Sequence, residues 1–389
     1  MIEKIFHGSK KYWLWLAFLA AVTAVGVVFY VDQLWNGLGI TGMSRDVSWG
    51  LYLANFTFFV GVAASGVMLV LPYYLHDQKE FGKIVILGEF LAVVACGMCI
   101  TFVTVDLGRP DRLVNLFLYP TPNSILFFDI VVLTGYLLLN IVIGWSVLDS
   151  ERKGEKPRSW IKPLILLSIP WAVSIHTVTA FIYAGLAGKT FWLTALMAPR
   201  FLATAFAAGP ALLIIIALIL RRYTDFDPGK IAIKKISTIV TYATIISFFF
   251  LLSEFFTVFY SGSPEHTATW KYLLFGEGGS GLQPYMWAVL FMMVAAIGLL
   301  VNPGTRYRHD TLLLACLLVF VAIWIDKGML LVIPGFIPNA LHEFTQYWPT
   351  GKEVAITMGV WGLGFLVLTL LYKIAISVKL EIGDQEIPH

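Results

Sequence analysis

The sequence predicts an all-α integral membrane protein with about ten transmembrane helices. Hydrophobic residues make up 58% of the 389 residues, charged residues only 13%, and the mean hydropathy is +0.80. Soluble domains carry about 25% charged residues, and a helix needs about 20 apolar residues to cross the hydrocarbon of a bilayer. Ten runs reach that length, at residues 12–34, 51–75, 84–105, 124–148, 163–187, 200–220, 236–260, 284–302, 311–331 and 353–377.

The first apolar run, 12–34, follows a basic start and begins like a signal peptide. It exceeds the 7–15 apolar residues of such a signal, and no small-residue cleavage site follows it. We therefore expect a retained first helix. None of the connections between the later runs is long enough to hold a soluble domain.

We expect the spans to form two related four-helix units, spans 2–5 and 6–9, with flanking helices. The segments NFTFFVGVAASGVML (55–69) and PRFLATAFAAGPALL (199–213) both place small residues late in an aromatic run. Small residues also simply allow close helix packing, so this repeat is faint. The expected division is a first helix with its outer loop at 1–46, a first unit at 47–190, a second unit at 191–335, and an outer loop, last helix and cytoplasmic tail at 336–389.

The distribution of basic residues predicts that both termini lie in the cytoplasm. Most of the 27 lysines and arginines fall in the termini and in the connections near residues 79, 155, 230 and 307. Basic connections stay on the cytoplasmic side of a membrane. The outer connections are longer and rich in Gly, Pro and aromatic residues, which is typical of ordered loops. We expect the protein to lie in the cytoplasmic membrane, surrounded by lipids. Its outer loops either dock a partner or only cap the helix bundle.

Composition excludes several kinds of site. The three cysteines, Cys96, Cys99 and Cys316, lie in apolar runs and are too few for a four-cysteine iron–sulfur cluster. Haem b needs facing pairs of histidines, yet only His176 lies deep in a span, and the C-x-x-C-H motif of c-type haem is absent. A net charge of +3 gives no case for nucleic-acid binding. We expect no metal, haem or iron–sulfur cluster in this chain, so its electrons must come from a partner's cofactor or a diffusible quinone.

Seven ionisable residues lie within the expected spans. Charge inside the hydrocarbon is costly, so each of them is a candidate functional residue. They are Glu89, Asp106, Asp129, His176, Glu254, Asp326 and Lys327. Chain direction places His176 near mid-membrane and Glu89 toward the cytoplasm, with the others nearer the outer face.

These residues also have structural interpretations. Adjacent charges such as Asp326 and Lys327 can each be neutralised by a neighbour, and a buried histidine can be a hydrogen-bonded core residue. Asp106 and Asp129 can pair at the membrane interface with Arg109 or Arg112, and these arginines can also pair with Asp111. Both interpretations stay open at the level of sequence.

The segment DLGRPDR (106–112) resembles the Asp-x-Gly-Arg-Pro-x-Arg motif of the NrfD/PsrC family, the membrane subunits of polysulfide-reductase-like quinone complexes. Gly108 and Pro110 are also expected to end the preceding helix. Other similar segments cover nearly the whole chain, at 47–66, 119–129, 174–185, 253–262 and 325–353. The ten-span length is most similar to the DsrP-type branch, from the sulfite-reductase-associated Dsr complex.

The resemblance implies a quinone site near the outer face, built in the first four-helix unit. It lies near Trp49, Tyr52, Asn55 and His176, with Asp106 and Arg109 at its floor. In this interpretation His176 and Asn55 contact the quinone carbonyls and Asp106 is a nearby acid or base. Candidates for proton transfer are Glu89, Asp129 and Glu254, with Asp326 and Lys327 as part of a second path.

The predicted function is that of a quinone-reactive membrane subunit of a multi-subunit oxidoreductase. It would exchange electrons between menaquinone, or another quinone, and an extracytoplasmic ferredoxin-like iron–sulfur subunit, with further redox subunits of a Dsr-type complex, in sulfur or sulfate respiration. The sequence leaves open whether this electron exchange is coupled to proton translocation. The alternatives are an ion or solute transporter and a pure membrane anchor. A transporter would favour broken helices at corresponding repeat positions, and the sequence shows none clearly.

Overall fold

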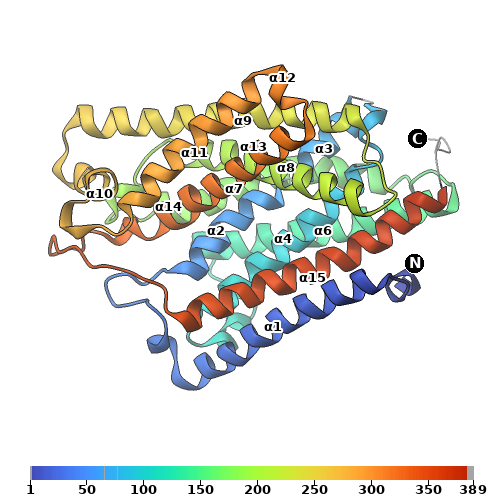
Figure 1. Ribbon diagram of the computed structural model, residues 1–389. Coiled ribbons are helices and arrows are strands. Elements are labelled where there is room, and N and C mark those ends of the chain that lie inside the picture. Colours follow the sequence, from blue (N-terminus) through green and yellow to red (C-terminus); the bar gives the residue numbers. More distant parts are fainter. Residues whose placement is uncertain (1, 65, 77, 383–389) are drawn as a thin grey trace.

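The computed structural model describes residues 2–382 except 65 and 77 and confirms an all-helical membrane bundle (Figure 1). Ten helices are long and apolar enough to span a membrane, as the sequence predicts. They are α1 (Lys10–Asn36), α2 (Leu51–Ala63) with its continuation, α4 (Val85–Asp106), α6 (Ile125–Lys153), α7 (Ile161–Ala184), α8 (Met197–Tyr223), α9 (Lys230–Ser261), α11 (Gln283–Val301), α13 (His309–Ile323) with its continuation, and α15 (Gly351–Ile382). The described residues contain no β-strand.

The connections carry short helices and define two ends of the bundle. We call the end holding the starts of α1, α4 and α7 the termini end, because the first and last spans begin and finish there, and the opposite end the loop end (Figure 1). Short helices of the termini end are η1 (Ile2–Phe6), η4 (Lys79–Phe81) and α12 (Pro303–Arg306). Those of the loop end are η2 (Leu38–Ile40), η5 (Pro110–Val114), α5 (Asn115–Leu118), η6 (Thr190–Trp192), α10 (Pro264–Phe275) and η7 (Glu277–Gly279).

The spanning helices pack as two rings and a flanking pair. α2, α4, α6 and α7 contact one another in sequence around one ring, and α8, α9, α11 and α13 do so around a second. α2 and α7 pack against α8, which joins the rings. α15 packs on α4, and α1 packs along α15, where Gly26 and Gly359 touch so closely that a Cβ on Gly26 would lie 2.5 Å from the Gly359 Cα. Small residues at this crossing let two membrane helices approach backbone to backbone.

Two spans are irregular where the sequence shows no clear break. After Ala63 the second span resumes as α3 (Val67–Val70) and ends in a π-helical turn, η3 (Leu71–Leu75). The ninth span changes from α13 to a π-helical turn, η8 (Trp324–Met329), before α14 (Leu330–Val332) and η9 (Pro334–Phe336). π-turns of this kind are frequent at functional sites.

These irregularities do not occupy equivalent places in the two rings. The second span is the first helix of its ring, whereas the ninth span is the last helix of the other. The regular helix α2 instead packs on the irregular part of the ninth span, since α2 contacts η8 and a Cβ on Gly328 would lie 2.9 Å from the Ala54 carbonyl oxygen. The two irregular spans therefore form the junction between the rings.

Candidate functional site

An aromatic cluster forms the loop end of the α2–α7 junction. The rings of Trp49 and Trp192 stack with centroids 5.6 Å apart, and Tyr183 and Phe336 both meet Trp49 edge-on. The Trp192 indole nitrogen donates a hydrogen bond to the Leu331 carbonyl oxygen at 2.8 Å, which fixes its orientation. Trp192 is fully buried between Trp49 and the backbone of Gly335, whereas Trp49 is partly exposed. Trp49 therefore leaves apolar aromatic surface of the kind that an aromatic or quinonoid ring packs against.

Lys189 lies at the edge of this cluster, in the connection after α7. Its ammonium nitrogen lies 4.7 Å from the centroid of the Phe336 ring, a cation–π contact. Partial burial against the aromatic surface lowers the pKa of Lys189 from its ordinary value. The site therefore has one cation facing the loop-end solvent.

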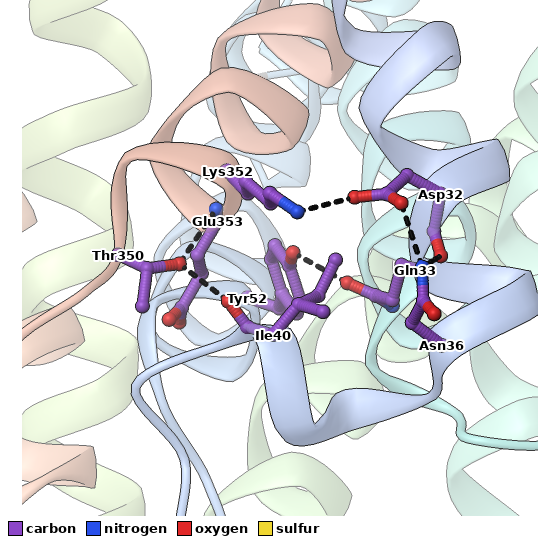
Figure 2. A network of polar contacts seen from close by, with 8 residues as sticks. All are labelled: Asp32, Gln33, Asn36, Ile40, Tyr52, Thr350, Lys352 and Glu353. Carbon is purple, nitrogen blue, oxygen red and sulfur yellow. Dashed lines mark hydrogen bonds and ion pairs between the residues drawn. The ribbon is translucent and has the colours of Figure 1, made fainter.

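Tyr52 is fully buried in the first turn of α2 and is hydrogen-bonded to α1 (Figure 2). Its hydroxyl donates to the Gln33 amide oxygen at 2.8 Å, and the Gln33 amide nitrogen donates to the Val105 carbonyl oxygen at 2.6 Å. Sequence reasoning selected Tyr52 but missed Gln33, because a glutamine near the end of a hydrophobic helix reads as an interfacial residue. The pair joins α1, α2 and α4.

Glu353 is a second buried residue that the sequence analysis missed. Its carboxylate accepts backbone hydrogen bonds from Gly42 at 2.8 Å and Leu51 at 3.1 Å, and it also accepts one from the Tyr347 hydroxyl. The spacing Thr350-x-x-Glu353 is that of a capping box, and the Glu353 backbone N–H donates to the Thr350 hydroxyl oxygen at 3.2 Å. That spacing marks a helix start but gives no indication that the carboxylate reaches the N-terminus of another helix.

Charged residues surround this network on its α1 side (Figure 2). Lys352 pairs with Asp32 at 2.7 Å, and Asn36 donates to the same carboxylate at 2.7 Å. The Thr350 hydroxyl donates to the Ile40 carbonyl oxygen at 2.8 Å. The start of α15 is thereby attached to the end of α1 and to the loop that follows it.

The charged motif after α4 separates into two parts. α4 ends at Asp106, and the chain turns so that Pro110 opens η5, as the sequence predicts. Arg109 is exposed and makes a bidentate ion pair with Asp111, with both distances at 3.0 Å, and this pair lowers the pKa of Asp111. Asp106 instead lies on the bundle side, where its Oδ1 is buried without a hydrogen-bond partner among the described residues.

Most of the hydrogen-bonding groups of the Asn55 side chain are used within the bundle. Its amide oxygen accepts from the indole nitrogens of Trp324 at 3.0 Å and Trp361 at 2.9 Å, and its amide nitrogen donates to the Leu51 carbonyl oxygen at 2.8 Å. An amide offers two acceptor sites and two N–H groups. Only one N–H of Asn55 is left for a ligand, so its expected contact with a quinone carbonyl rests on that single donor.

His176 is fully buried in α7, and neither ring nitrogen has a hydrogen-bond partner among the described residues. Buried polar groups are nearly always hydrogen-bonded, so an unpartnered imidazole needs an explanation. His176 lies seven residues before Tyr183, which places both on one face of α7. Tyr183 hydrogen-bonds Thr57 of α2, so this face of α7 points at α2 and the aromatic cluster.

η8 brings two charged residues into the junction between the rings. Asp326 pairs with Arg200 of α8 at 2.6 Å, and both side chains are buried. Lys327 is buried as well, with its ammonium nitrogen 4.2 Å from the Phe201 ring centroid and 3.5 Å from the Phe201 carbonyl oxygen. Arg200 thus neutralises Asp326, as the structural interpretation of this residue expects.

The remaining candidates lie further apart. Asp129 of α6 accepts a 2.6 Å hydrogen bond from Thr179 of α7, and Glu254 of α9 accepts one at 3.3 Å from Thr194 in the loop end. Glu89 of α4 lies toward the termini end, far from the aromatic cluster along its helix. The structure thus gathers Trp49, Tyr52, Asn55, Asp106 and His176 around α2, and it leaves Arg109 in solvent.

The residues present fit a quinone in chemistry. Stacked indoles, a buried imidazole with two unpartnered nitrogens and an unpartnered carboxylate oxygen are groups that bind a flat ring and its carbonyl oxygens. Among the described residues, no three His, Cys, Asp or Glu side chains gather as metal ligands. The three cysteines are buried and unbridged.

Comparison with known proteins places the chain in one family. Residues 39–340 match the family described as polysulphide reductase, NrfD. The chain is 26% identical to a Halobacterium salinarum protein named as a membrane subunit of dimethyl sulfoxide reductase, over 91% of this chain and 89% of that one.

Two further relatives cover almost the full length. A selenate reductase subunit of Mesobacillus selenatarsenatis is 24% identical over 98% of this chain and 96% of its own. The Hdr-like menaquinol oxidoreductase integral membrane subunit of Archaeoglobus fulgidus is 22% identical over 96% of this chain and 95% of its own. Since the family match covers most of the sequence, the chain belongs to the NrfD polysulphide reductase family.

Proposed function

We propose that this chain is the quinone-exchanging membrane subunit of a multi-subunit oxidoreductase. Electrons pass between menaquinone in the membrane and an iron–sulfur subunit docked on the loop end, which faces out of the cytoplasm. The observation that carries this proposal is His176, a fully buried imidazole with both nitrogens unpartnered among the described residues, two helical turns along α7 from Tyr183 of the aromatic cluster. The family membership and the name of the Archaeoglobus relative, a menaquinol oxidoreductase subunit, support it.

Each residue of the site has a role that its surroundings allow. His176 binds a carbonyl oxygen through a ring N–H and can hold or release a proton there. The partly exposed Trp49 packs against the flat ring, and Trp192, stacked behind it, holds Trp49 in place and excludes water. The remaining N–H of Asn55 can donate to a second oxygen. The bound quinone supplies two-electron, two-proton redox chemistry.

Proton exchange with the loop end falls to Asp106. Its buried Oδ1 has no partner among the described residues, and it lies near Tyr52 and Glu353 at the boundary of the bundle. A carboxyl group in that place can receive a proton from His176 and release it outward. Asp129, Glu254, Asp326 and Lys327 are further proton-transfer candidates around the junction, and Glu89 lies apart from them.

The partners that suit this function are a ferredoxin-like iron–sulfur subunit and further redox subunits of a Dsr-type complex in sulfur or sulfate respiration. We propose that the 47–190 segment holds the site and that the 191–335 segment supports it through η8. The transporter alternative is not favoured, because the irregular spans do not occupy equivalent places in the two rings.

The test is purification of the native assembly from its membrane in mild detergent. Mass spectrometry should identify an iron–sulfur subunit and bound menaquinone in the same preparation. An Asp106→Asn variant should retain the quinone but slow quinol-linked turnover about 100-fold. Asp111→Asn, a matched carboxylate in the same motif, should leave turnover unchanged because that side chain is exposed.

Other outcomes would overturn this assignment. A chain that purifies with neither quinone nor redox partner would favour the transporter alternative. A chain that holds an iron–sulfur partner but no quinone, and that supports no quinol turnover, would be a pure membrane anchor.

A further inference from the structure

A stripe of polar residues follows the buried face of α6 from one end of the bundle to the other. Its members are Asp129, Tyr136, Asn140 and Glu151, all buried. Their spacings of seven, four and eleven residues keep them in one narrow sector of the helix, which has 3.6 residues per turn. The stripe is about 33 Å long at 1.5 Å per residue, close to the ~30 Å thickness of the hydrocarbon.

Glu89 of α4 fills the longest gap in this stripe. A Cβ on Gly144 would lie 3.3 Å from the Glu89 Oε2, so the carboxyl group rests on the α6 backbone between Asn140 and Glu151. Glu89 is 1% exposed, and neither of its oxygens has a hydrogen-bond partner among the described residues. An ionised carboxylate at this position would have no hydrogen-bond donor to compensate its charge. The geometry therefore favours the protonated, neutral carboxyl group.

The termini end of the stripe carries an ion pair, which we call its mouth. The Lys379 ammonium of α15 lies 2.7 Å from the Glu151 carboxylate and donates to the Gly82 carbonyl oxygen at 2.9 Å. These side chains are nearly buried, at 12% and 9% exposed, and they lie on the termini side of Glu89.

The titratable and charged groups that face Glu89 come from three neighbouring elements. They are Glu151 and Tyr136 of α6, Lys379 of α15, and Tyr74 of η3. Tyr136 lies on the stripe beside Asn140, whose amide nitrogen donates to its carbonyl oxygen at 2.8 Å. The polar groups next to Glu89 thus lie both toward the mouth and toward the loop end.

The other end of the stripe meets the quinone site. Asp129 accepts the 2.6 Å hydrogen bond of Thr179, which lies one turn from His176 on α7. α6 therefore connects a nearly buried charged pair toward one end of the bundle with Asp129, whose partner Thr179 is a neighbour of His176 on α7.

We propose that Glu89 is a proton-loading site, filled from the termini end through the Glu151–Lys379 pair and emptied along the α6 stripe toward Asp129. The carboxyl O–H of Glu89 gives up its proton toward Asp129, and the resulting carboxylate takes a proton from water at the mouth. The inference rests on the proposed function for the final acceptor, a quinone that has received electrons. It assigns the termini side as the source of those protons.

Infrared difference spectroscopy of the full chain in nanodiscs tests the loading site without any redox partner. A protonated carboxyl C=O band should shift on transfer to D2O, and Glu89→Gln should abolish that band. Asp149→Asn, a matched control two residues before Glu151 on α6 and paired with Lys153, should leave it intact. If the band is absent from the wild type, or persists in Glu89→Gln, Glu89 does not hold an exchangeable proton and the proposal fails.

Proton uptake by the whole complex in vesicles tests the route. Glu89→Gln should retain bound quinone but lose about 100-fold of the proton uptake from the termini side. Gly144→Ala, which crowds the same carboxyl group without removing it, should slow uptake less and shift the infrared band. Wild-type uptake in Glu89→Gln would overturn the route. A complex without quinone would overturn the proposed function alone, since the infrared test does not need it.

Discussion

Two buried carboxyl groups at opposite ends of the bundle lie in contrasting surroundings. Glu353, at the loop end, is 0% exposed and accepts hydrogen bonds from two backbone amides and a tyrosine hydroxyl. Glu89, toward the termini end, is 1% exposed and has no hydrogen-bond partner among the described residues. A carboxylate that accepts three hydrogen bonds holds separate chain segments together, whereas a carboxyl group that accepts none is free to exchange a proton.

The same contrast separates two buried polar residues at the centre. Asn55 uses its amide to hold Trp324 and Trp361, while His176 uses neither ring nitrogen. Burial alone therefore does not distinguish structural from functional polar groups in this protein. The number of hydrogen bonds that a buried polar group already makes distinguishes the two roles. The predictions below follow from that distinction.

The largest expected effect is on the bonded carboxylate. Glu353→Ala leaves the Gly42 amide and the Tyr347 hydroxyl without their acceptor, while the Leu51 amide keeps the Tyr347 hydroxyl oxygen at 2.7 Å. Each buried donor left unpaired costs about 1–3 kcal/mol. We expect a loss of roughly 2–6 kcal/mol in the free energy of unfolding, measured by denaturant titration in detergent. Glu89→Gln should lose almost none, and equal losses in the two variants would contradict the comparison.

Asn55→Leu should have the next largest effect. It removes the acceptor shared by two indole N–H groups that are only partly buried, so the expected loss is about 2 kcal/mol in the free energy of unfolding. Thermal unfolding followed by tryptophan fluorescence measures it, because both indoles report on the same site. A variant as stable as the wild type would show that these hydrogen bonds do not hold the junction of α2, η8 and α15.

Alkaline pH should weaken the Glu353 network through Tyr347. Burial raises the pKa of Tyr347, and the neighbouring Glu353 charge and hydrogen bond raise it further. The unfolded tyrosine titrates near its ordinary pKa of about 10. Stability from this group is therefore complete below about pH 10 and falls above it by up to about 1.4 kcal/mol per pH unit. Tyr347→Phe should reduce that slope by one proton in unfolding experiments at several alkaline pH values.

The smallest effect belongs to the exposed part of the charged motif. The Arg109 pair lowers the pKa of Asp111, so its contribution to stability is present above the ordinary carboxyl pKa and is lost as pH falls through the lower folded value. Because both side chains are exposed, Asp111→Asn should leave the melting temperature within experimental error at pH 7. A measurable drop would mean that the motif is more than a helix terminator at this position.

Much of the fold could be predicted because it depends on hydrophobic length. The third span is predicted at 84–105 and observed as Val85–Asp106, and the eighth at 284–302 and observed as Gln283–Val301. The seventh span begins earlier than predicted, at Lys230, because its basic first turns extend past the apolar run. Helix α10 was not predicted, since it is short, shows little amphipathic periodicity and lies within a connection rich in Gly, Pro and aromatic residues.

The site was harder to predict because it depends on long-range partners. The sequence selected Asp106 and His176 as ionisable residues in apolar spans, and the family resemblance selected Tyr52. The sequence could not decide between Asp106 and Asp111 as the partner of Arg109, and it could not show that Glu353 would reach α2, more than 300 positions earlier in the chain. The π-helical turn that aligns Lys327 with the junction also has no local signal, because tertiary packing with α2 determines it.

The most direct test of the account is to measure quinone content and melting temperature together for His176→Leu in the native assembly. The account predicts that the variant melts at or above the wild-type temperature, because no hydrogen bond is lost, and that bound menaquinone disappears. A variant that retains its menaquinone, or that unfolds at a markedly lower temperature with the wild type's quinone content, would show that His176 is a structural residue and contradict the account.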